Sequence, residues 1–133
     1  MMGKVMNKDT EHYAIKILVD TEYQPGESDP EQDQYFFTYT ITLHNIGQVA
    51  AKLLSRHWII TDGAGHSREV RGVGVVGQTP HLEPGASFRY TSGALLETPV
   101  GAMYGSYQLM ADDGTAFDAN IPAFTLAVPH LLH

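Results

Sequence analysis

Large apolar and polar side chains alternate at every second position along much of the chain. The clearest case is the segment 35–44, where polar residues alternate with a regular apolar set and Phe36 is the one break in the polar set. The apolar set is Tyr35, Phe37, Tyr39, Ile41 and Leu43. A period of two is typical of a half-buried β-strand, because a helix would turn successive members of the set to different sides. Weaker alternation recurs near 15–20, 87–91, 105–110 and 116–121. We therefore expect a chain built mainly from strands.

Turn-forming residues separate these runs. Asp62-Gly63 and Asp113-Gly114 are the strongest hairpin signals, since both residue types tolerate a positive φ. The segment 22–34 has two prolines and no aliphatic residue, which predicts a loop. No apolar stripe with helical spacing exceeds one turn. An antiparallel two-sheet sandwich of about seven or eight strands is therefore the leading all-β architecture, with a small barrel as the alternative.

Length and composition fit one domain with one core. The chain has 133 residues, of which 43% are hydrophobic and 17% are charged. We expect a single sandwich domain over 12–128, between a flexible N-terminal tail at 1–11 and a C-terminal tail at 129–133. The single tryptophan, Trp58, lies in an apolar run and is predicted to pack between the two sheets.

Charge and cysteine content exclude several classes of function. Eight Lys and Arg against fifteen Asp and Glu give a net charge of −7, which disfavours nucleic-acid binding. The absence of cysteine excludes disulfides, thiolate nucleophiles and cysteine zinc sites. No apolar run is long enough to span a bilayer, and residues 1–8 lack the apolar segment of a secretory signal. We expect a cytoplasmic protein with neither a nucleic-acid nor a membrane partner.

Residues 72–77 read Gly-Val-Gly-Val-Val-Gly, the spacing of a phosphate-binding glycine loop. In a dinucleotide site these glycines lead from a strand into a helix, whose N-terminus meets the phosphates. Pro80 and Pro84 follow too closely for a helix to form. A kinked strand with a connecting loop is the main interpretation. The alternative is an anion loop that uses backbone N–H groups, with Arg71, Gly72, Gly74 and Gly77 as its candidate residues.

An acidic segment and the histidines are the candidates for metal binding. Asp29, Glu31 and Asp33 alternate as in a calcium loop, but the turn glycine is missing and Thr40 stands where the last glutamate belongs. A solvated loop is the main interpretation, and weak attraction of divalent cations is the alternative. The seven histidines show no zinc spacing, and no serine lies in a nucleophile motif. We therefore assign no metal ligand, no cofactor and no catalytic residue, and expect no enzymatic activity.

The order of motifs along the chain resembles the bacterial ApaG family. The resemblance extends from Tyr13 to Leu126 and rests on seven segments: 56–62, 69–77, 82–85, 90–93, 98–103, 105–107 and 121–124. It implies a sandwich of the immunoglobulin or fibronectin type III kind, in agreement with the alternation. Gly72, Gly74 and Gly77 match the glycine motif of the family.

The resemblance also implies a class of function. Similar domains are appended to eukaryotic F-box proteins and to a DNA polymerase delta-interacting protein, where they are inferred to bind proteins. Bacterial members have been linked to cobalt and magnesium handling, and their gene often neighbours a diadenosine tetraphosphate hydrolase. The family supplies no catalytic residue. We therefore expect a protein-binding module, with self-association through sheet edges left open. Divalent cation binding or homeostasis, and phosphate or nucleotide binding by the glycine loop, are the alternatives.

Overall fold

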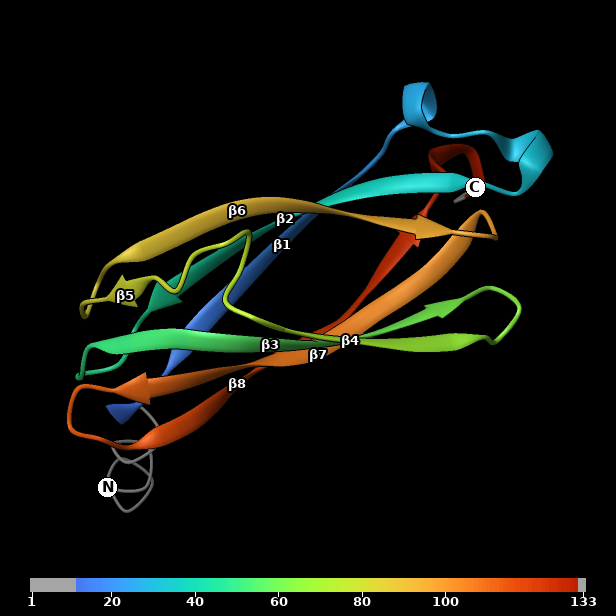
Figure 1. The fold of residues 1–133 in the computed structure, drawn as a ribbon. Helices are drawn as coiled ribbons and strands as arrows, with labels where there is room; N and C mark the ends of the chain where they lie inside the picture. Colours follow the sequence, from blue (N-terminus) through green and yellow to red (C-terminus); the bar gives the residue numbers. More distant parts are fainter. Residues whose placement is uncertain (1–11, 132–133) are drawn as a thin grey trace, which may run out of the picture.

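The computed structural model describes residues 12–131, which form eight strands and three short 3-10 turns (Figure 1). The strands are β1 (Ile15–Tyr23), β2 (Tyr35–Asn45), β3 (Ala51–Asp62), β4 (Ser67–Val73), β5 (His81–Leu82), β6 (Ser87–Leu96), β7 (Val100–Ala111) and β8 (Ala116–Ala127). The turns are η1 (Pro25–Glu27), η2 (Pro30–Gln32) and η3 (Pro129–Leu131). Residues 1–11 and 132–133, which belong to the two expected tails, lie outside the described residues.

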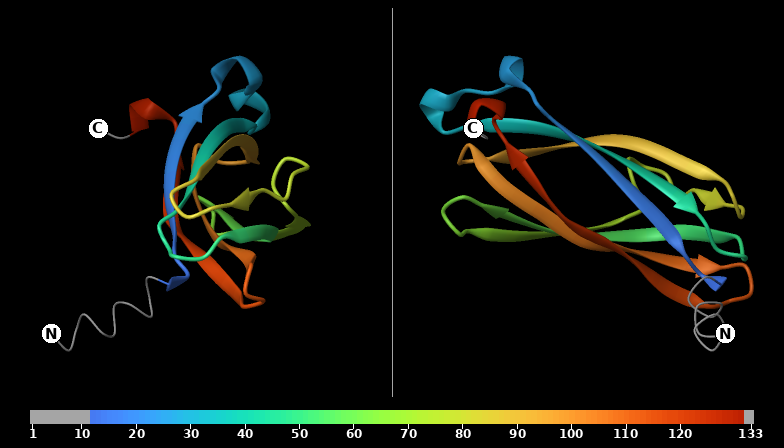
Figure 2. Two further views of the ribbon diagram at one scale, coloured as in Figure 1. Left: turned by 90° about the vertical axis from the view of Figure 1, so that its left-hand side faces the viewer. Right: turned by 180° about the vertical axis from the view of Figure 1, so that it is seen from behind.

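The strands form two antiparallel layers packed face to face (Figures 1 and 2). One sheet has the order β1-β2-β6, and the other has the order β4-β3-β7-β8, with β5 also paired to β3. This arrangement confirms the predicted two-sheet sandwich of the immunoglobulin or fibronectin type III kind. Among residues 12–131, no helix is both long and apolar enough to cross a lipid bilayer.

The core lies between the sheets, where the alternating apolar side chains meet. Phe37, Ile41 and Leu43 of β2 are almost fully buried, whereas the threonines between them lie on the outer face. Trp58 of β3 is also buried, and its ring makes an edge contact with Tyr107 of β7. The pattern in 35–44 and the core position predicted for Trp58 are therefore confirmed.

The two sides of the sandwich differ in how they are closed. On one side, β1 and β8 contact each other. On the opposite side lie the edge strands β6 and β4, where the guanidinium of Arg68 on β4 donates to the carbonyl of Leu95 on β6 at 3.0 Å. Residues 74–80 leave the sheet between β4 and β5 and project on this second side (Figure 2). The glycine motif therefore lies at the more open side.

Candidate functional site

The glycine motif forms the end of a strand and a loop that returns to the same sheet. Gly72 lies within β4, and the following residues reach β5, which pairs with β3 as β4 does. The register of β3 shifts between Leu53 and Ser55, and at this bulge the N–H of Gly74 donates to the carbonyl of Leu54 at 2.8 Å. The bulge thus holds the loop at the sheet edge. No helix follows the motif; the chain enters a tight turn instead.

The tip of this loop is a two-residue turn with an unusual occupant. The N–H of Val75 donates to the carbonyl of Gln78 at 2.8 Å, and the N–H of Gln78 donates to the carbonyl of Val75 at 2.9 Å. Val76 and Gly77 between them have φ values of 42° and 79°. Two positive φ angles define a type I′ turn, for which Asn-Gly is the favoured pair. A β-branched residue such as Val76 is strained in this conformation.

Arg56 of β3 holds the start of the loop through two hydrogen bonds. Its guanidinium donates to the carbonyl of Val73 at 3.1 Å and to the carbonyl of Gly74 at 2.8 Å. Arg56 pairs with Gly72 across β3 and β4, and a Cβ on Gly72 would stand 2.7 Å from the guanidinium. The missing side chain of Gly72 therefore makes room for Arg56. The sequence motif does not include this arginine, and a two-residue turn at Asp62-Gly63 would have paired Arg56 with Glu69, whereas the observed hairpin is centred on Ala64.

The loop already uses most of the N–H groups that an anion would need. The N–H groups of Gly74, Val75 and Gln78 all donate to carbonyls within the chain. Arg71 is directed to the Glu69 carboxylate, 3.4 Å away. The structure therefore places Arg71 beside Gly72 along the chain but does not gather its guanidinium and the glycine N–H groups around one point. Anion binding by this loop stays a prediction.

The loop instead presents apolar side chains to solvent. We name this surface the valine loop and define it by Leu54, Val73 and Val76, which are 38%, 79% and 52% exposed. Val75, in contrast, is fully buried and anchors the loop in the core. Exposed apolar residues on a braced loop are typical of a protein contact.

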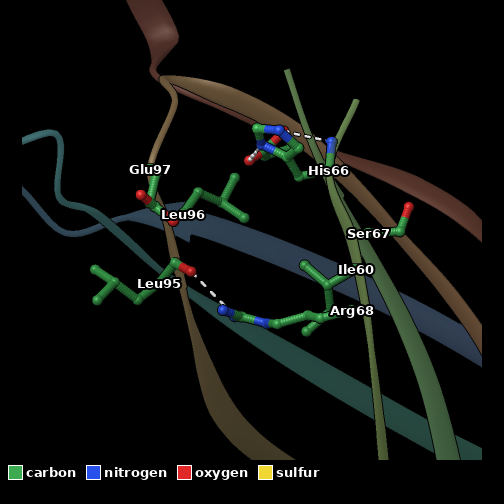
Figure 3. Close-up of a pocket in the computed structure, with 8 residues that line it drawn as sticks. Ile60, His66, Ser67, Arg68, Leu95, Leu96 and Glu97 are labelled. Atoms are coloured by element: carbon green, nitrogen blue, oxygen red, sulfur yellow. Dashed lines mark hydrogen bonds and ion pairs between the residues drawn. The ribbon is translucent and has the colours of Figure 1, made fainter. Parts of the chain in front are cut away.

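A small pocket lies on the same side, where the β3–β4 hairpin approaches the end of β6 (Figure 3). Its volume is about 150 Å³, and it is lined by Ile60, Asp62, His66, Ser67, Arg68, Leu95, Leu96 and Glu97. Asp62 accepts from the N–H groups of Ala64 and His66 at 2.9 and 3.0 Å. These bonds, chiefly that from His66, hold the pKa of Asp62 below its usual value. The pocket is too small for most substrates, which need about 300 Å³ or more, but it fits a side chain.

The acidic segment lies at one end of the molecule. Asp29 and Asp33 flank η2, which contains Glu31, and all three carboxylates are exposed. Within residues 12–131, no group of three or more His, Asp or Glu side chains is placed to hold a metal ion. The histidines make pairwise contacts, such as His57 with Glu69 at 2.9 Å and His81 with Asp112 at 2.8 Å. The negative charge of this segment would attract cations, but within residues 12–131 no set of side chains is placed to coordinate one.

A pair of buried tyrosines also joins the two sheets. The hydroxyls of Tyr90 on β6 and Tyr107 on β7 share a short hydrogen bond inside the core. Burial raises the pKa of both hydroxyls, so both stay neutral at physiological pH. A neutral, buried and mutually satisfied pair is suited to holding the sheets in register, not to proton transfer.

Comparison with known proteins adds a family to this geometry. The family model described as the ApaG domain matches residues 25–111. The chain belongs to the ApaG family. Protein ApaG of Aromatoleum aromaticum is 57% identical over 125 residues, which are 94% of this chain and 98% of that protein. Protein ApaG of Pseudomonas paraeruginosa is 58% identical over 125 residues, with the same coverage.

Solved structures agree with this assignment. A crystal structure described as an ApaA protein of Bordetella pertussis has a TM-score of 0.87 at 48% identity and covers 90% of this chain and 97% of its own. A second X-ray structure has a TM-score of 0.85 at 51% identity and covers 90% of both chains. The ApaG resemblance expected from the motifs is therefore confirmed. None of these names states a reaction, so the role of this ApaG-family chain has to be argued from its surface.

Proposed function

We propose that the chain is a non-enzymatic module that binds a protein partner, and that the valine loop is part of the contact. The observation that carries this proposal is Val76. Its side chain is half exposed, although its backbone has the left-handed conformation that β-branched residues avoid. Such strain costs on the order of 1–3 kcal/mol and persists where a particular side chain is required.

Folding stability alone does not explain valine at this position. Asn-Gly at positions 76 and 77 would fit the same type I′ turn with less strain. A half-exposed valine gains little from burial in the free protein. In a complex the same side chain would be covered, and the apolar contact would then contribute to affinity. The strain at Val76 is therefore best explained by a partner.

The bracing of the loop supports the same proposal. Arg56 holds two of its carbonyls, the bulge at Leu54 holds the N–H of Gly74, and Val75 is anchored in the core. A loop fixed in this way loses little conformational entropy when a partner binds. We expect this partner in the cytoplasm.

The decisive variant is Val76→Asn. It relieves the backbone strain, so the free energy of unfolding should rise by about 1 kcal/mol. A photo-crosslinking amino acid at Val73, in cells that naturally produce the chain, should yield one discrete adduct that Val76→Asn removes. Leu18→Asn is the matched control, since Leu18 is 53% exposed on β1 in the other sheet. It should leave the adduct intact.

Three results would contradict the proposal. If Val76→Asn lowers the free energy of unfolding, valine at this position serves the fold itself. If the adduct persists undiminished in Val76→Asn, or forms equally in a chain carrying the crosslinker at Leu18, the valine loop does not mediate the contact. The cation and phosphate alternatives have no gathered site to support them among residues 12–131, and they predict amide shifts with Mg²⁺, Co²⁺ or ATP.

A further inference from the structure

A second surface, distinct from the valine loop, lies at the end of the molecule that carries the acidic segment. The turns η1 and η2, the β6–β7 connection and η3 gather there (Figure 1). A hollow of about 290 Å³ lies among them, lined by Tyr23, Pro30, Tyr35, Pro99, Val128 and His130. We name it the tyrosine groove. Most of its lining is apolar, with two tyrosines and two prolines.

A second hollow adjoins the groove. It is lined by Thr21, Glu22, Tyr23, Pro25, Ala127 and Pro129, so it shares Tyr23 with the tyrosine groove. The Tyr23 ring packs on Phe37 of the core, with ring centroids 5.3 Å apart, which holds it in place. Two hollows that share one fixed aromatic ring are suited to an extended chain with bulky side chains on either side of that ring. Aromatic-lined grooves of this kind accept the preformed polyproline II conformation.

The charge around the groove is mainly negative, although His130 lines the groove and Arg89 lies beside Asp20 and Glu22. From Asp20 to Gln34 the chain has six carboxylates and no lysine or arginine. Pro30, a wall of the groove, stands between Asp29 and Glu31, and Glu22 lines the adjoining hollow. Among residues 12–131, none of the six carboxylates forms an ion pair. A partner that carries positive charge would complement this rim, and the complementarity would favour both its approach and its orientation.

We infer that the tyrosine groove binds an extended, basic, proline-containing peptide segment of another protein. The prolines of this segment would pack against Tyr23 and Tyr35, and its lysine or arginine side chains would face Asp29, Glu31 and their neighbours. The apolar lining selects proline, and the acidic rim selects the charge. A second copy of the chain fits the rim less well, because its own net charge is −7.

The test is a selection of random twelve-residue peptides, displayed on phage, on the immobilised intact chain. We expect the enriched peptides to carry proline together with arginine or lysine, and to shift the amide resonances of Tyr23, Tyr35 and Val128. Glu31→Lys reverses one rim charge and should weaken binding of the enriched peptides by about tenfold. Asp118→Lys makes the same change of net charge at an exposed site on β8 and should leave binding nearly unchanged.

A second variant tests the apolar half of the inference. Tyr23→Leu keeps an apolar side chain against Phe37 but removes the ring shared by the two hollows, so it should also weaken peptide binding. The melting temperature of Tyr23→Leu reports whether this variant keeps its fold. If it does not fold, Glu31→Lys still tests the inference. If only the charge of the rim contributed to binding, Tyr23→Leu would bind the enriched peptides as tightly as the wild type does. That result would overturn the proline part of the inference.

Other outcomes would overturn the inference as a whole. These are the absence of enriched peptides, enrichment of acidic or proline-free peptides, and equal weakening by Glu31→Lys and Asp118→Lys. Binding that appears only after removal of residues 132–133 would mean that the groove receives the end of its own chain. The valine loop is tested separately, because Val76→Asn should not affect these peptides. Failure of the selection therefore leaves the proposed function standing.

Discussion

Individual glycines of the hexapeptide serve different purposes, and the difference can be measured. Gly74 has a φ of 63°, and a Cβ there would stand 2.2 Å from the carbonyl oxygen of Gln78. Gly77 has a φ of 79°, but a Cβ there would meet nothing within 4 Å. Position 77 therefore needs glycine for its backbone conformation alone, whereas position 74 also needs it for a close contact.

We expect Gly77→Ala to lower the free energy of unfolding by about 1–2 kcal/mol, the usual cost of a left-handed alanine. Gly74→Ala should cost clearly more, because the Gln78 carbonyl that it would displace is the acceptor for Val75. Urea denaturation of both variants and the wild type measures the two costs. An equal or reversed order would mean that the contact at Gly74 is not as described.

The same glycines show what a local pattern can and cannot predict. Proline at positions 80 and 84 was enough to exclude a helix after the motif, and the chain indeed turns there. Gly72 makes room for the Arg56 side chain only because the register of β3 and β4 places the two residues opposite each other. The bulge at Leu54 likewise depends on how β3 pairs with β7. Such pairings are not visible in a window of six residues. The sequence therefore left a structural loop and an anion loop both open.

Within residues 12–131, two buried polar contacts join the sheets: the tyrosine pair, and the bond from the Asn45 side chain on β2 to the Leu82 carbonyl on β5 at 2.9 Å. Tyr90 belongs to the three-stranded sheet and Tyr107 to the five-stranded sheet. Both side chains are buried, and each hydroxyl has the other as its hydrogen-bond partner. Removing one hydroxyl leaves the other buried without its hydrogen-bond partner. Removing both hydroxyls leaves no unsatisfied hydroxyl at this place.

We predict that Tyr107→Phe costs about 1–3 kcal/mol of stability, because the hydroxyl of Tyr90 is left unsatisfied. Tyr90→Phe should have a similar cost for the same reason. The double variant should cost clearly less than the sum of the two, with a coupling free energy of about 1 kcal/mol or more. Guanidinium denaturation of the four chains completes the cycle, and additive costs would show that the hydroxyls do not depend on each other.

Most elements could be predicted from the sequence, because strand alternation is a local property. Residues 35–44 gave both the strand and its buried face, and Trp58 was placed in the core from its apolar neighbours. The tyrosine groove was out of reach, because its lining comes from four separate parts of the chain, around 23, 30–35, 99 and 128. The acidic segment was visible as charge, but the wall it forms with Pro99 and Val128 depends on the fold.

The whole molecule carries an excess of negative charge, and several carboxylates are held ionised by specific partners. Asp113 accepts from the hydroxyl of Tyr13 and from the N–H of Thr115, and the Tyr13 bond contributes most to lowering its pKa. The hydrogen bond from His57 similarly lowers the pKa of Glu69. Asp62 is held by backbone N–H groups in the β3–β4 turn. The folded state therefore binds fewer protons than the unfolded state in mild acid.

The sign of the pH dependence follows from these lowered pKa values. The unfolded carboxyls titrate near 3.8 for aspartate and 4.5 for glutamate, and the folded ones titrate lower. The stability that they contribute is fully present above the unfolded values and is lost as the pH falls through the folded values. We expect these groups to change the melting temperature little near neutral pH and to lower it below about pH 4.5.

Asp113→Asn should make that drop in melting temperature shallower. Asp118→Asn, which removes an exposed carboxylate on β8, should leave the drop unchanged. Identical acid limbs for the two variants would show that the bonds from Tyr13 and Thr115 to Asp113 do not distinguish the folded carboxylate from the unfolded one.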